Sequence, residues 1–337
     1  MVTGATGFVG AHSTKALLDA GHDVRLLVRD PARIDAALGP LGVADRPVFV
    51  TGDMLDAGAV REAVAGCDAV LHCAAIVALD RRRAADVLDA NPRGVRTVVE
   101  AALEAGLDPV VHVSSTSALF RPGLDRLHTD LPPAQVANAY GRSKAVAETW
   151  VRERQAEGAP IAVTYPAGVV GPPAGPAFGE WAEGIVTHLR LGLSPVRGAA
   201  VSIIDVRDLG SIHAALLEPG RGPRRHLCGG HFLTMTQLGQ LYRELTGRRF
   251  PVVPVPGRAL RATGRAVDVA LRVLPVDSVI TGEAMAVLTQ WVPTEDRGLD
   301  ELGVRLRPVR ETVADAIRGL HAAGRLTDRQ VGRLARD

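Results

Sequence analysis

The sequence has few cysteines and no long apolar run. Its three cysteines, Cys67, Cys73 and Cys228, are odd in number and lack metal-ligand spacing. Reduced, buried thiols of a cytoplasmic protein are therefore expected, without a metal site. No uncharged apolar run reaches the roughly 20 residues that a membrane span needs, and no signal peptide precedes the first motif. These absences predict a cytoplasmic protein without a membrane partner.

The sequence also lacks an excess of charge of either sign. Its 39 Lys and Arg against 37 Asp and Glu give a net charge of +2, and no basic tract is interleaved with aromatic residues. Nucleic acid is therefore not an expected partner. The 337 residues, 47% hydrophobic and 23% charged, are typical of an ordinary globular protein with one large or two smaller domains.

A glycine-rich stretch opens the chain. In the sequence from Met1 to Gly10, Gly4, Gly7 and Gly10 are spaced by three and a helical pattern follows. This predicts a strand, a tight turn and a helix whose N-terminus favours a pyrophosphate. The spacing differs from GxGxxG, so a glycine-rich turn without a ligand stays open. Only Met1–Thr3 remain for the strand, which is therefore unusually short unless the natural start lies upstream.

Arg29 bears on the choice of cofactor. It stands at the carboxyl end of a strand predicted for Asp23–Val28, where an acidic residue would accept from a ribose 2′-hydroxyl and a guanidinium suits a 2′-phosphate. Arg29, helped by Arg33, favours NADP. Because the neighbouring Asp30 is acidic, NAD stays the alternative cofactor.

Three further strands are predicted over residues 47–51, 69–73 and 109–113. After the first, Asp53 could accept from the adenine amino group or cap a helix. After the second, small residues at Ala74 and Ala75 would let a ligand approach the backbone. Within that strand, His72 is expected to be a core histidine.

Asn91 lies in a helix predicted from Ala84 to Gly106. Pro92 follows it directly and suggests a kink. An amide at a kink could reach a neighbouring strand, for a structural or a functional purpose.

Hydroxyl groups follow the strand that ends at Val113. Ser114–Ser117 stand where the carboxyl end of a central parallel strand meets a ligand crevice. One of them could hydrogen-bond a substrate oxygen while another group protonates it.

That second group is predicted to be Tyr140. On a helix capped by Asn138, Tyr140 and Lys144 share one face. A phenol titrates near ~10, and a neighbouring cation favours its ionised form, so Tyr140 could exchange a proton near neutral pH. An inert Tyr and Lys pair on a solvated helix stays the alternative.

In this order the motifs resemble the extended short-chain dehydrogenase/reductase family, also called the NAD-dependent epimerase/dehydratase family. The resemblance spans nearly the whole chain. It is carried by Thr3–Gly10, Gly52–Asp56, His72–Ala75, Ser114–Thr116, Tyr140 with Lys144, Tyr165–Pro172 and Ile204–Leu209.

The resemblance implies site residues. Tyr140 is implied as the acid/base, Lys144 as the group that binds the nicotinamide ribose and lowers the pKa of Tyr140, and Thr116 as the catalytic hydroxyl, with Ser115 as the fallback. The implied cofactor-binding residues are Gly4, Thr6, Gly7, Phe8, Val9, Arg29, Asp53, Met54, Ala74, Ser114, Tyr140, Lys144 and Pro166. No metal site is implied.

The predicted fold is α/β, a Rossmann-type doubly wound parallel sheet with a smaller, mostly helical C-terminal substrate lobe. Residues 1–171 are assigned to the cofactor domain, to which 199–219 return. Residues 172–198 and 220–337 are assigned to the substrate lobe.

Features of the second part are less specific. Thr234–Thr246 and Val309–Leu320 have helical periodicity. Phe178, Trp181 and Ile185 could line a pocket or simply pack. A solvated stripe is expected for one set of helix-spaced arginines, with an anionic-substrate or partner surface as the alternative: Arg258, Arg261, Arg265 and Arg272.

Tyr165–Pro172 and the segment from Arg29 to Pro31 are similar to those of dihydroflavonol reductases and 3β-hydroxysteroid dehydrogenases. This predicts an NADP-dependent reductase in which a hydride passes from the nicotinamide to a ketone carbon of a small-molecule substrate, while Tyr140 protonates the oxygen. The alternatives are a nucleotide-sugar epimerase or dehydratase with tightly bound NAD, and a cofactor-sensing regulator without turnover. A homodimer stays open.

Overall fold

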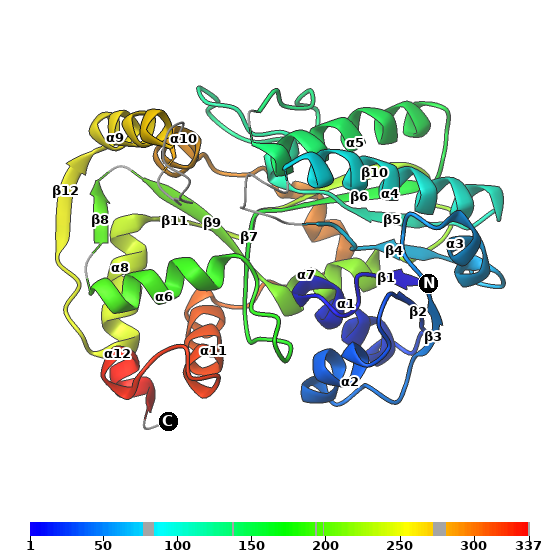
Figure 1. Ribbon diagram of the computed structural model, residues 1–337, viewed down its shortest axis with the longest axis horizontal. Coiled ribbons are helices and arrows are strands. Elements are labelled where there is room, and N and C mark those ends of the chain that lie inside the picture. Colours follow the sequence, from blue (N-terminus) through cyan, green and yellow to red (C-terminus); the bar gives the residue numbers. More distant parts are fainter. Residues whose placement is uncertain (77–83, 137, 193, 198, 272–280, 336–337) are drawn as a thin grey trace.

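A computed structural model describes residues 1–76, 84–136, 138–192, 194–197, 199–271 and 281–335 (Figure 1). Two lobes share a long cleft. The first is built on a seven-stranded sheet, and the second on helices with two small sheets.

The seven-stranded sheet is parallel throughout, in the order β10-β6-β5-β4-β1-β2-β3. Its strands are β1 (Val2–Thr3), β2 (Arg25–Val28), β3 (Val48–Thr51), β4 (Val70–His72), β5 (Val110–Val113), β6 (Ile161–Pro166) and β10 (Arg224–Cys228). The chain moves from β1 to β3 in one direction and then resumes at β4 on the other side of β1. That reversal leaves a crevice at the carboxyl ends of the strands, which is where ligands bind in such sheets.

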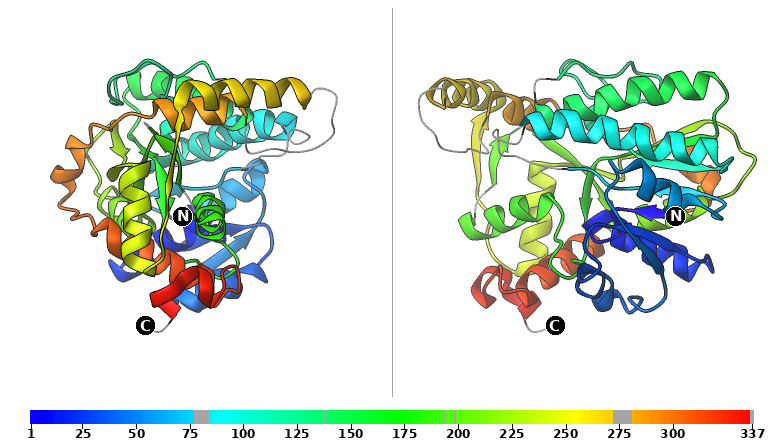
Figure 2. Two further views of the ribbon diagram at one scale, coloured as in Figure 1. Left: turned by 90° about the vertical axis from the view of Figure 1, so that its left-hand side faces the viewer. Right: turned by 45° about the vertical axis from the view of Figure 1, so that its right-hand side comes forward.

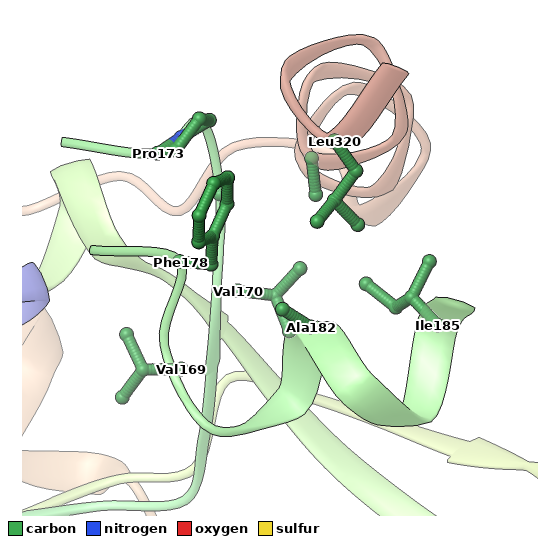
Figure 3. A pocket seen from close by; sticks show the side chains of 9 residues that line it. Val169, Val170, Pro173, Phe178, Ala182, Ile185 and Leu320 are labelled. Carbon is green, nitrogen blue, oxygen red and sulfur yellow. The ribbon is translucent and has the colours of Figure 1, made fainter. Parts of the chain in front are cut away.

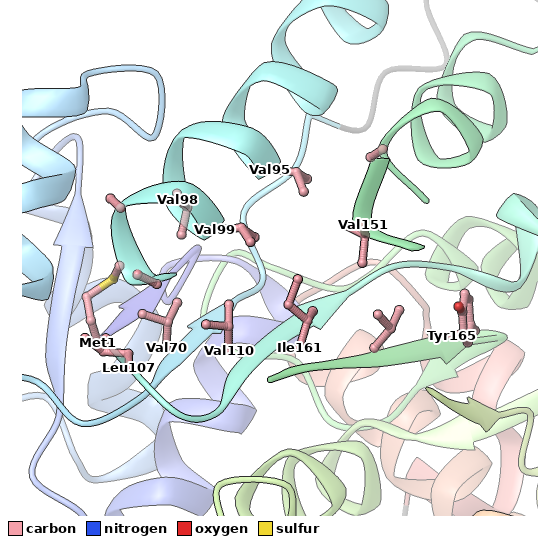
Figure 4. Close-up of a cluster of buried hydrophobic side chains, with 14 of the residues drawn as sticks. Met1, Val70, Val95, Val98, Val99, Leu107, Val110, Val151, Ile161 and Tyr165 are labelled. Carbon is pink, nitrogen blue, oxygen red and sulfur yellow. The ribbon is translucent and has the colours of Figure 1, made fainter. Parts of the chain in front are cut away.

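Helices cover both faces of this sheet (Figure 1). One face carries α3 (Ala57–Val64), α4 (Ala84–Glu104) and α5 (Ala139–Ala156), and the other carries α1 (Phe8–Asp19), α2 (Arg33–Leu38) and α7 (Val206–Ala215). Side chains alternate between the faces, so Val110 lies in one core cluster and Val111 in the other. Figure 4 shows Val95, Val98 and Val99 of α4 packed over strand residues.

The second lobe contains most of the remaining elements. Its helices are α6 (Trp181–Leu191), α8 (Met235–Thr246), α9 (Gly257–Ala270), α10 (Gly282–Gln290), α11 (Val309–Ala322) and α12 (Asp328–Val331). A three-stranded sheet joins β7 (Gly168–Val170), β9 (Ala200–Asp205) and β11 (His231–Thr234), and a two-stranded sheet joins β8 (Ser194–Arg197) and β12 (Val252–Pro256). Figure 2 shows α9 and α10 side by side at one end of this lobe.

The predicted Rossmann-type fold is confirmed, and its first strand is Val2–Thr3. The predicted helices are present as α8, where Thr234 forms a capping box with Gln237, and α11. α4 runs through Pro92. The segment Val201–Leu217 forms β9 and α7, of which α7 packs against α1 while β9 belongs to the small sheet.

The large sheet extends further along the chain than the sequence suggested. Strand β10, which lies within the segment 220–337 assigned to the second lobe, pairs with β6 and completes this sheet. The division of the chain into two domains otherwise stays a prediction.

The cysteines are free thiols, as expected. Cys228 is buried, and Cys67 and Cys73 are half-buried. Burial raises the pKa of the Cys73 thiol to about 12, which makes it a poor nucleophile.

Three of the four predicted stripe arginines lie on α9. Arg258 and Arg265 are exposed, whereas half-buried Arg261 donates to Thr289 at 2.8 Å. Arg272 lies outside the described residues. No helix in the described part of the chain is both long and apolar enough to cross a membrane.

Candidate functional site

Each glycine of the first loop has its own steric role. Gly4 has φ +75°, and a Cβ there would lie 2.7 Å from the amide nitrogen of Ala74 at the end of β4. A Cβ on Gly10 would lie 2.1 Å from the carbonyl oxygen of Gly4. Gly7 is the N-cap of α1. The loop therefore folds tightly over β1 and β4, and it presents the first turn of α1 to the crevice as an anion-binding end.

The crevice is a cleft of about 790 Å³, within the range of small-molecule and cofactor sites. All residues predicted to bind the cofactor line it: Gly4, Thr6, Gly7, Phe8, Val9, Arg29, Asp53, Met54, Ala74, Ser114, Tyr140, Lys144 and Pro166. They come from the ends of six neighbouring strands and from two helices. The glycine cradle and the polar strand ends fit a dinucleotide.

One end of the cleft holds the groups predicted to face the adenosine. Arg29 and Arg33 are exposed there, and the Arg29 guanidinium lies 3.8 Å from the Asp53 carboxylate. Asp30 is not part of the lining. Its carboxylate instead accepts from the Ala32 amide at 3.1 Å.

Asp53 does not cap the following helix. Its carboxylate accepts from the Leu55 amide at 2.9 Å, whereas the N-cap of α3 is Asp56, which accepts from Gly58 and Ala59. Helix capping, the alternative interpretation of Asp53, is therefore wrong. Asp53 lies on the cleft wall.

The other end of the cleft holds Tyr140 and Lys144 on α5. Asn138 caps the helix as predicted, since its side chain accepts from Gly141 at 2.6 Å. The Lys144 ammonium donates to the Val113 carbonyl at 2.9 Å and lies 5.8 Å from the Tyr140 ring centre. One helix turn therefore fixes the phenol and the ammonium beside the end of β5.

Asn91 braces this arrangement from α4. Its side-chain oxygen accepts a hydrogen bond from the Ile76 amide at 2.7 Å. Its side-chain nitrogen donates to the Ile76 carbonyl at 2.9 Å and to the Ser143 hydroxyl at 3.1 Å. Asn91 therefore ties the segment after β4 to the helix turn that carries Tyr140 and Lys144.

A buried carboxylate lies one turn further along α5. Glu148 is fully buried and accepts from Tyr165 at 2.5 Å, from Arg152 at 2.6 Å and from Ser114 at 3.4 Å. These contacts hold α5 against β5 and β6 below the cleft.

His72 is a core histidine, as expected. It is buried, hydrogen-bonds the Thr3 hydroxyl at 2.7 Å and stacks on His112. Burial, with the charge of Lys144, lowers the pKa of His72 to about 3, so it stays neutral at pH 7.

The structure does not show the lowered phenol pKa that the sequence suggested. Burial raises the pKa of Tyr140 well above its usual range, the charge of Glu180 raises it further, and a hydrogen bond with Ser115 only partly offsets them. Burial lowers the pKa of Lys144 to about 8. The expectation of a depressed Tyr140 pKa is wrong here because burial and the charge of Glu180 together outweigh the hydrogen bond with Ser115.

The two candidate hydroxyls after β5 lie in different places. Thr116 is buried, donates to the Pro166 carbonyl at 3.1 Å and is not part of the cleft lining. Ser115 lines the cleft and is the hydroxyl that hydrogen-bonds Tyr140. The structure therefore brings Ser115, Tyr140 and Lys144 together and leaves Thr116 outside.

Sequence reasoning missed much of the lining beside Tyr140, at the end of the cleft that we call the substrate end because the proposed proton donor lies there. Gly179, Glu180, Trp181 and Glu183 enter the cleft at the start of α6. Of these, only Trp181 was considered as a pocket residue. The run of glycine and proline before them gave no periodic signal for where their side chains would point.

Phe178 and Ile185 pack instead of lining the cleft. With Val169, Val170, Pro173, Ala182 and Leu320 they surround a void of about 10 Å³ between α6 and α11 (Figure 3), which has room for about one water molecule.

Comparison with known proteins adds the family. The model of the NAD dependent epimerase/dehydratase family matches residues 1–224. The chain belongs to this family. Its relatives include sterol demethylase protein B of Methylococcus capsulatus, 30% identical over 268 residues that cover 77% of this chain and 78% of the relative. Cinnamoyl-CoA reductase 1 of Oryza sativa subsp. japonica is 28% identical over 337 residues, covering 96% and 91%.

Solved structures of the epimerase/dehydratase family share the fold. The structure of a UDP-glucose-4-epimerase from Stenotrophomonas maltophila with bound NAD and formylated UDP-arabinopyranose has a TM-score of 0.73 at 21% identity, over 96% of this chain and 98% of that one. As a member of this family, the chain is an NAD(P)-dependent oxidoreductase that acts on a CH–OH or carbonyl group.

Proposed function

We propose that the protein is an NADPH-dependent reductase of a ketone, with Tyr140 as the proton donor. The observation that supports this most is the shared wall of Ser115, Tyr140 and Lys144 on the same cleft as the glycine loop. A carbonyl oxygen held at this wall would meet two hydroxyl donors beside an ammonium group.

The raised pKa of Tyr140 suits reduction. The phenol is protonated at neutral pH in the free protein, so the donor is already in the state that carbonyl reduction consumes. Ser115 would donate a second hydrogen bond to the developing alkoxide. The Lys144 ammonium, charged below its pKa of about 8, would hold the ribose and stabilise the phenolate left behind.

NADPH, when bound, supplies the hydride. Arg29 and Arg33 support the choice of NADPH, because guanidinium groups complement a 2′-phosphate. Asp30, the acid that could have accepted from a 2′-hydroxyl, is engaged by the Ala32 amide.

The first test is Tyr140→Phe, measured by NADPH oxidation with a panel of ketones and by NADPH binding. Loss of the donor should lower kcat by roughly 10³-fold, within the range for general acid catalysis, with cofactor affinity within about twofold. Unchanged turnover would contradict the mechanism. Ser115→Ala should lower kcat more than Thr116→Val if Ser115 is the second donor.

Purification with retained NAD would favour the second candidate, a nucleotide-sugar epimerase or dehydratase, which the family description also covers. Cofactor binding without turnover of any ketone or sugar nucleotide would instead favour a regulator.

A further inference from the structure

Glu180 occupies a fixed position at the substrate end of the cleft. A Cβ on the preceding Gly179, which has φ +76°, would lie 2.6 Å from the Phe8 ring, so only glycine lets this segment approach the glycine loop. The following Trp181 packs its indole against Gly168, where a Cβ would lie 2.5 Å from the ring. Both neighbours of Glu180 are therefore held by close contacts.

The side chains around Glu180 divide between the lobe interior and the cleft. Phe178 and Ala182 point into the apolar void under α11 (Figure 3). Glu180 lines the cleft together with Tyr140 and Lys144. The charge of its carboxylate raises the pKa of both groups, which means that it lies within electrostatic reach of the proposed proton donor.

Glu183 provides a contrast one turn along α6. Its carboxylate also lines the cleft, but it pairs with Arg325 at 2.5 Å. Glu180 has no ion pair or hydrogen bond of its side chain within the described part of the chain. Its side chain is exposed to the cleft and its carboxylate interacts electrostatically with Lys144, so it is open to a hydrogen bond from a ligand.

We propose that Glu180 selects the substrate: its carboxylate accepts a hydrogen bond from a hydroxyl or ammonium group near the reacting carbonyl, and it disfavours substrates that carry an anionic group there. This rests on the proposed reductase function and adds a substrate class to it. A site built around one polar partner rejects ligands that leave this partner unpaired or that repel it.

The test uses three acetophenones that share one skeleton and differ in a single ring substituent: aminomethyl, hydroxymethyl or carboxylate. Wild type, Glu180→Gln and Glu183→Gln are compared at pH 7 by kcat/KM with NADPH. Binding of each probe in the presence of NADP⁺ is followed by tryptophan fluorescence, which needs no turnover. Matching thermal melts check that the variants fold.

Wild type should favour the aminomethyl and hydroxymethyl probes over the carboxylate by about tenfold or more, the effect expected of one charged contact. Glu180→Gln should reduce this preference at least about fivefold, and Glu183→Gln should leave it within about twofold, because Arg325 already neutralises that carboxylate.

Equal preferences in wild type and Glu180→Gln, equal shifts in the two variants, or no binding of any probe would overturn the proposal. If binding preferences depend on Glu180 while no probe is reduced, the proposed reductase function fails and the role of Glu180 stands. If the probes are reduced without discrimination, the reductase function stands and the role of Glu180 fails.

Discussion

The two ends of the cleft are built in different ways. The cofactor end is made of backbone: glycines whose missing Cβ atoms let β1, β4 and α1 approach one another, and short polar residues at strand ends. The substrate end is made of side chains that arrive from the start of α6 and from α5. The backbone geometry of the cofactor end tolerates few substitutions, whereas the side chains of the substrate end can be substituted one at a time. The first end therefore suits a ligand that stays the same between relatives, and the second suits a ligand that differs between them.

The largest effect should come from breaking the backbone cradle. In Gly10→Ala the new methyl group would lie 2.1 Å from the Gly4 carbonyl oxygen. Because that oxygen belongs to the backbone, the clash can be relieved only if the glycine loop or α1 moves. We expect a loss of about 3 kcal/mol in the free energy of unfolding, with NADPH affinity lowered more than roughly a hundredfold. Chemical denaturation and fluorescence titration measure the two quantities.

The matched control lies at the substrate end. Gly184 is within α6 and has open space around its Cβ position, so Gly184→Ala should be neutral or stabilising by up to about 1 kcal/mol. A similar loss in both variants would remove the distinction between the two ends.

An intermediate effect should come from Arg29. Arg29→Gln removes a cation from the adenosine end and should weaken NADPH binding by roughly tenfold, the value of one charge-assisted contact of about 1.4 kcal/mol. NADH binding should stay within about twofold. Arg93→Gln, which removes an exposed arginine that pairs with Asp89 and is not part of the cleft lining, should change neither affinity. Equal losses for NADPH and NADH would show that Arg29 does not recognise the 2′-phosphate.

The smallest effect concerns a contact between the two lobes. His12 on α1 donates a ring N–H to the carbonyl of Pro172 at 2.9 Å, and burial, only partly opposed by this bond, lowers its pKa to about 4. The unfolded chain binds a proton near pH 6.5 and the folded chain does not, so stability falls as pH falls through that window.

Between pH 7 and 5.5 this linkage amounts to about 1 kcal/mol. His12→Gln keeps a hydrogen-bond donor but has no titrating ring. Its free energy of unfolding should therefore fall by about 1 kcal/mol less than that of wild type between pH 7 and 5.5, as measured by urea denaturation at both pH values. His22→Gln, at an exposed position, should follow wild type. Parallel pH profiles for all three proteins would contradict the role of His12.

The cofactor end could be predicted from the sequence because its determinants are local. The spacing of Gly4, Gly7 and Gly10 specifies a turn and a helix start within ten residues, and Asn138 is one residue before its helix. Every predicted cofactor residue then lines the cleft, although their roles in binding stay predictions.

Two features of the reacting end could not be deduced from the sequence: which hydroxyl after β5 faces the cleft, and the pKa of Tyr140. Ser115 rather than Thr116 faces the cleft because the chain enters a 3₁₀ turn at Thr116, with the Ser115 side chain accepting from Ser117. That rotation cannot be deduced from the strand's alternation. The pKa of Tyr140 depends on burial and on Glu180, forty residues away in sequence, so the helix spacing of Tyr140 and Lys144 alone gave the wrong sign.

The position of β10 has a consequence for how such an enzyme can change. The chain leaves the large sheet after β6, forms part of the second lobe, and comes back to pair β10 with β6 before it leaves again. Neither lobe is therefore one uninterrupted piece of sequence. An exchange of the substrate lobe between two relatives would need at least three junctions, one after β6 and one on each side of β10. A single crossover after β6 would unite a cofactor sheet with an edge strand inherited from another parent.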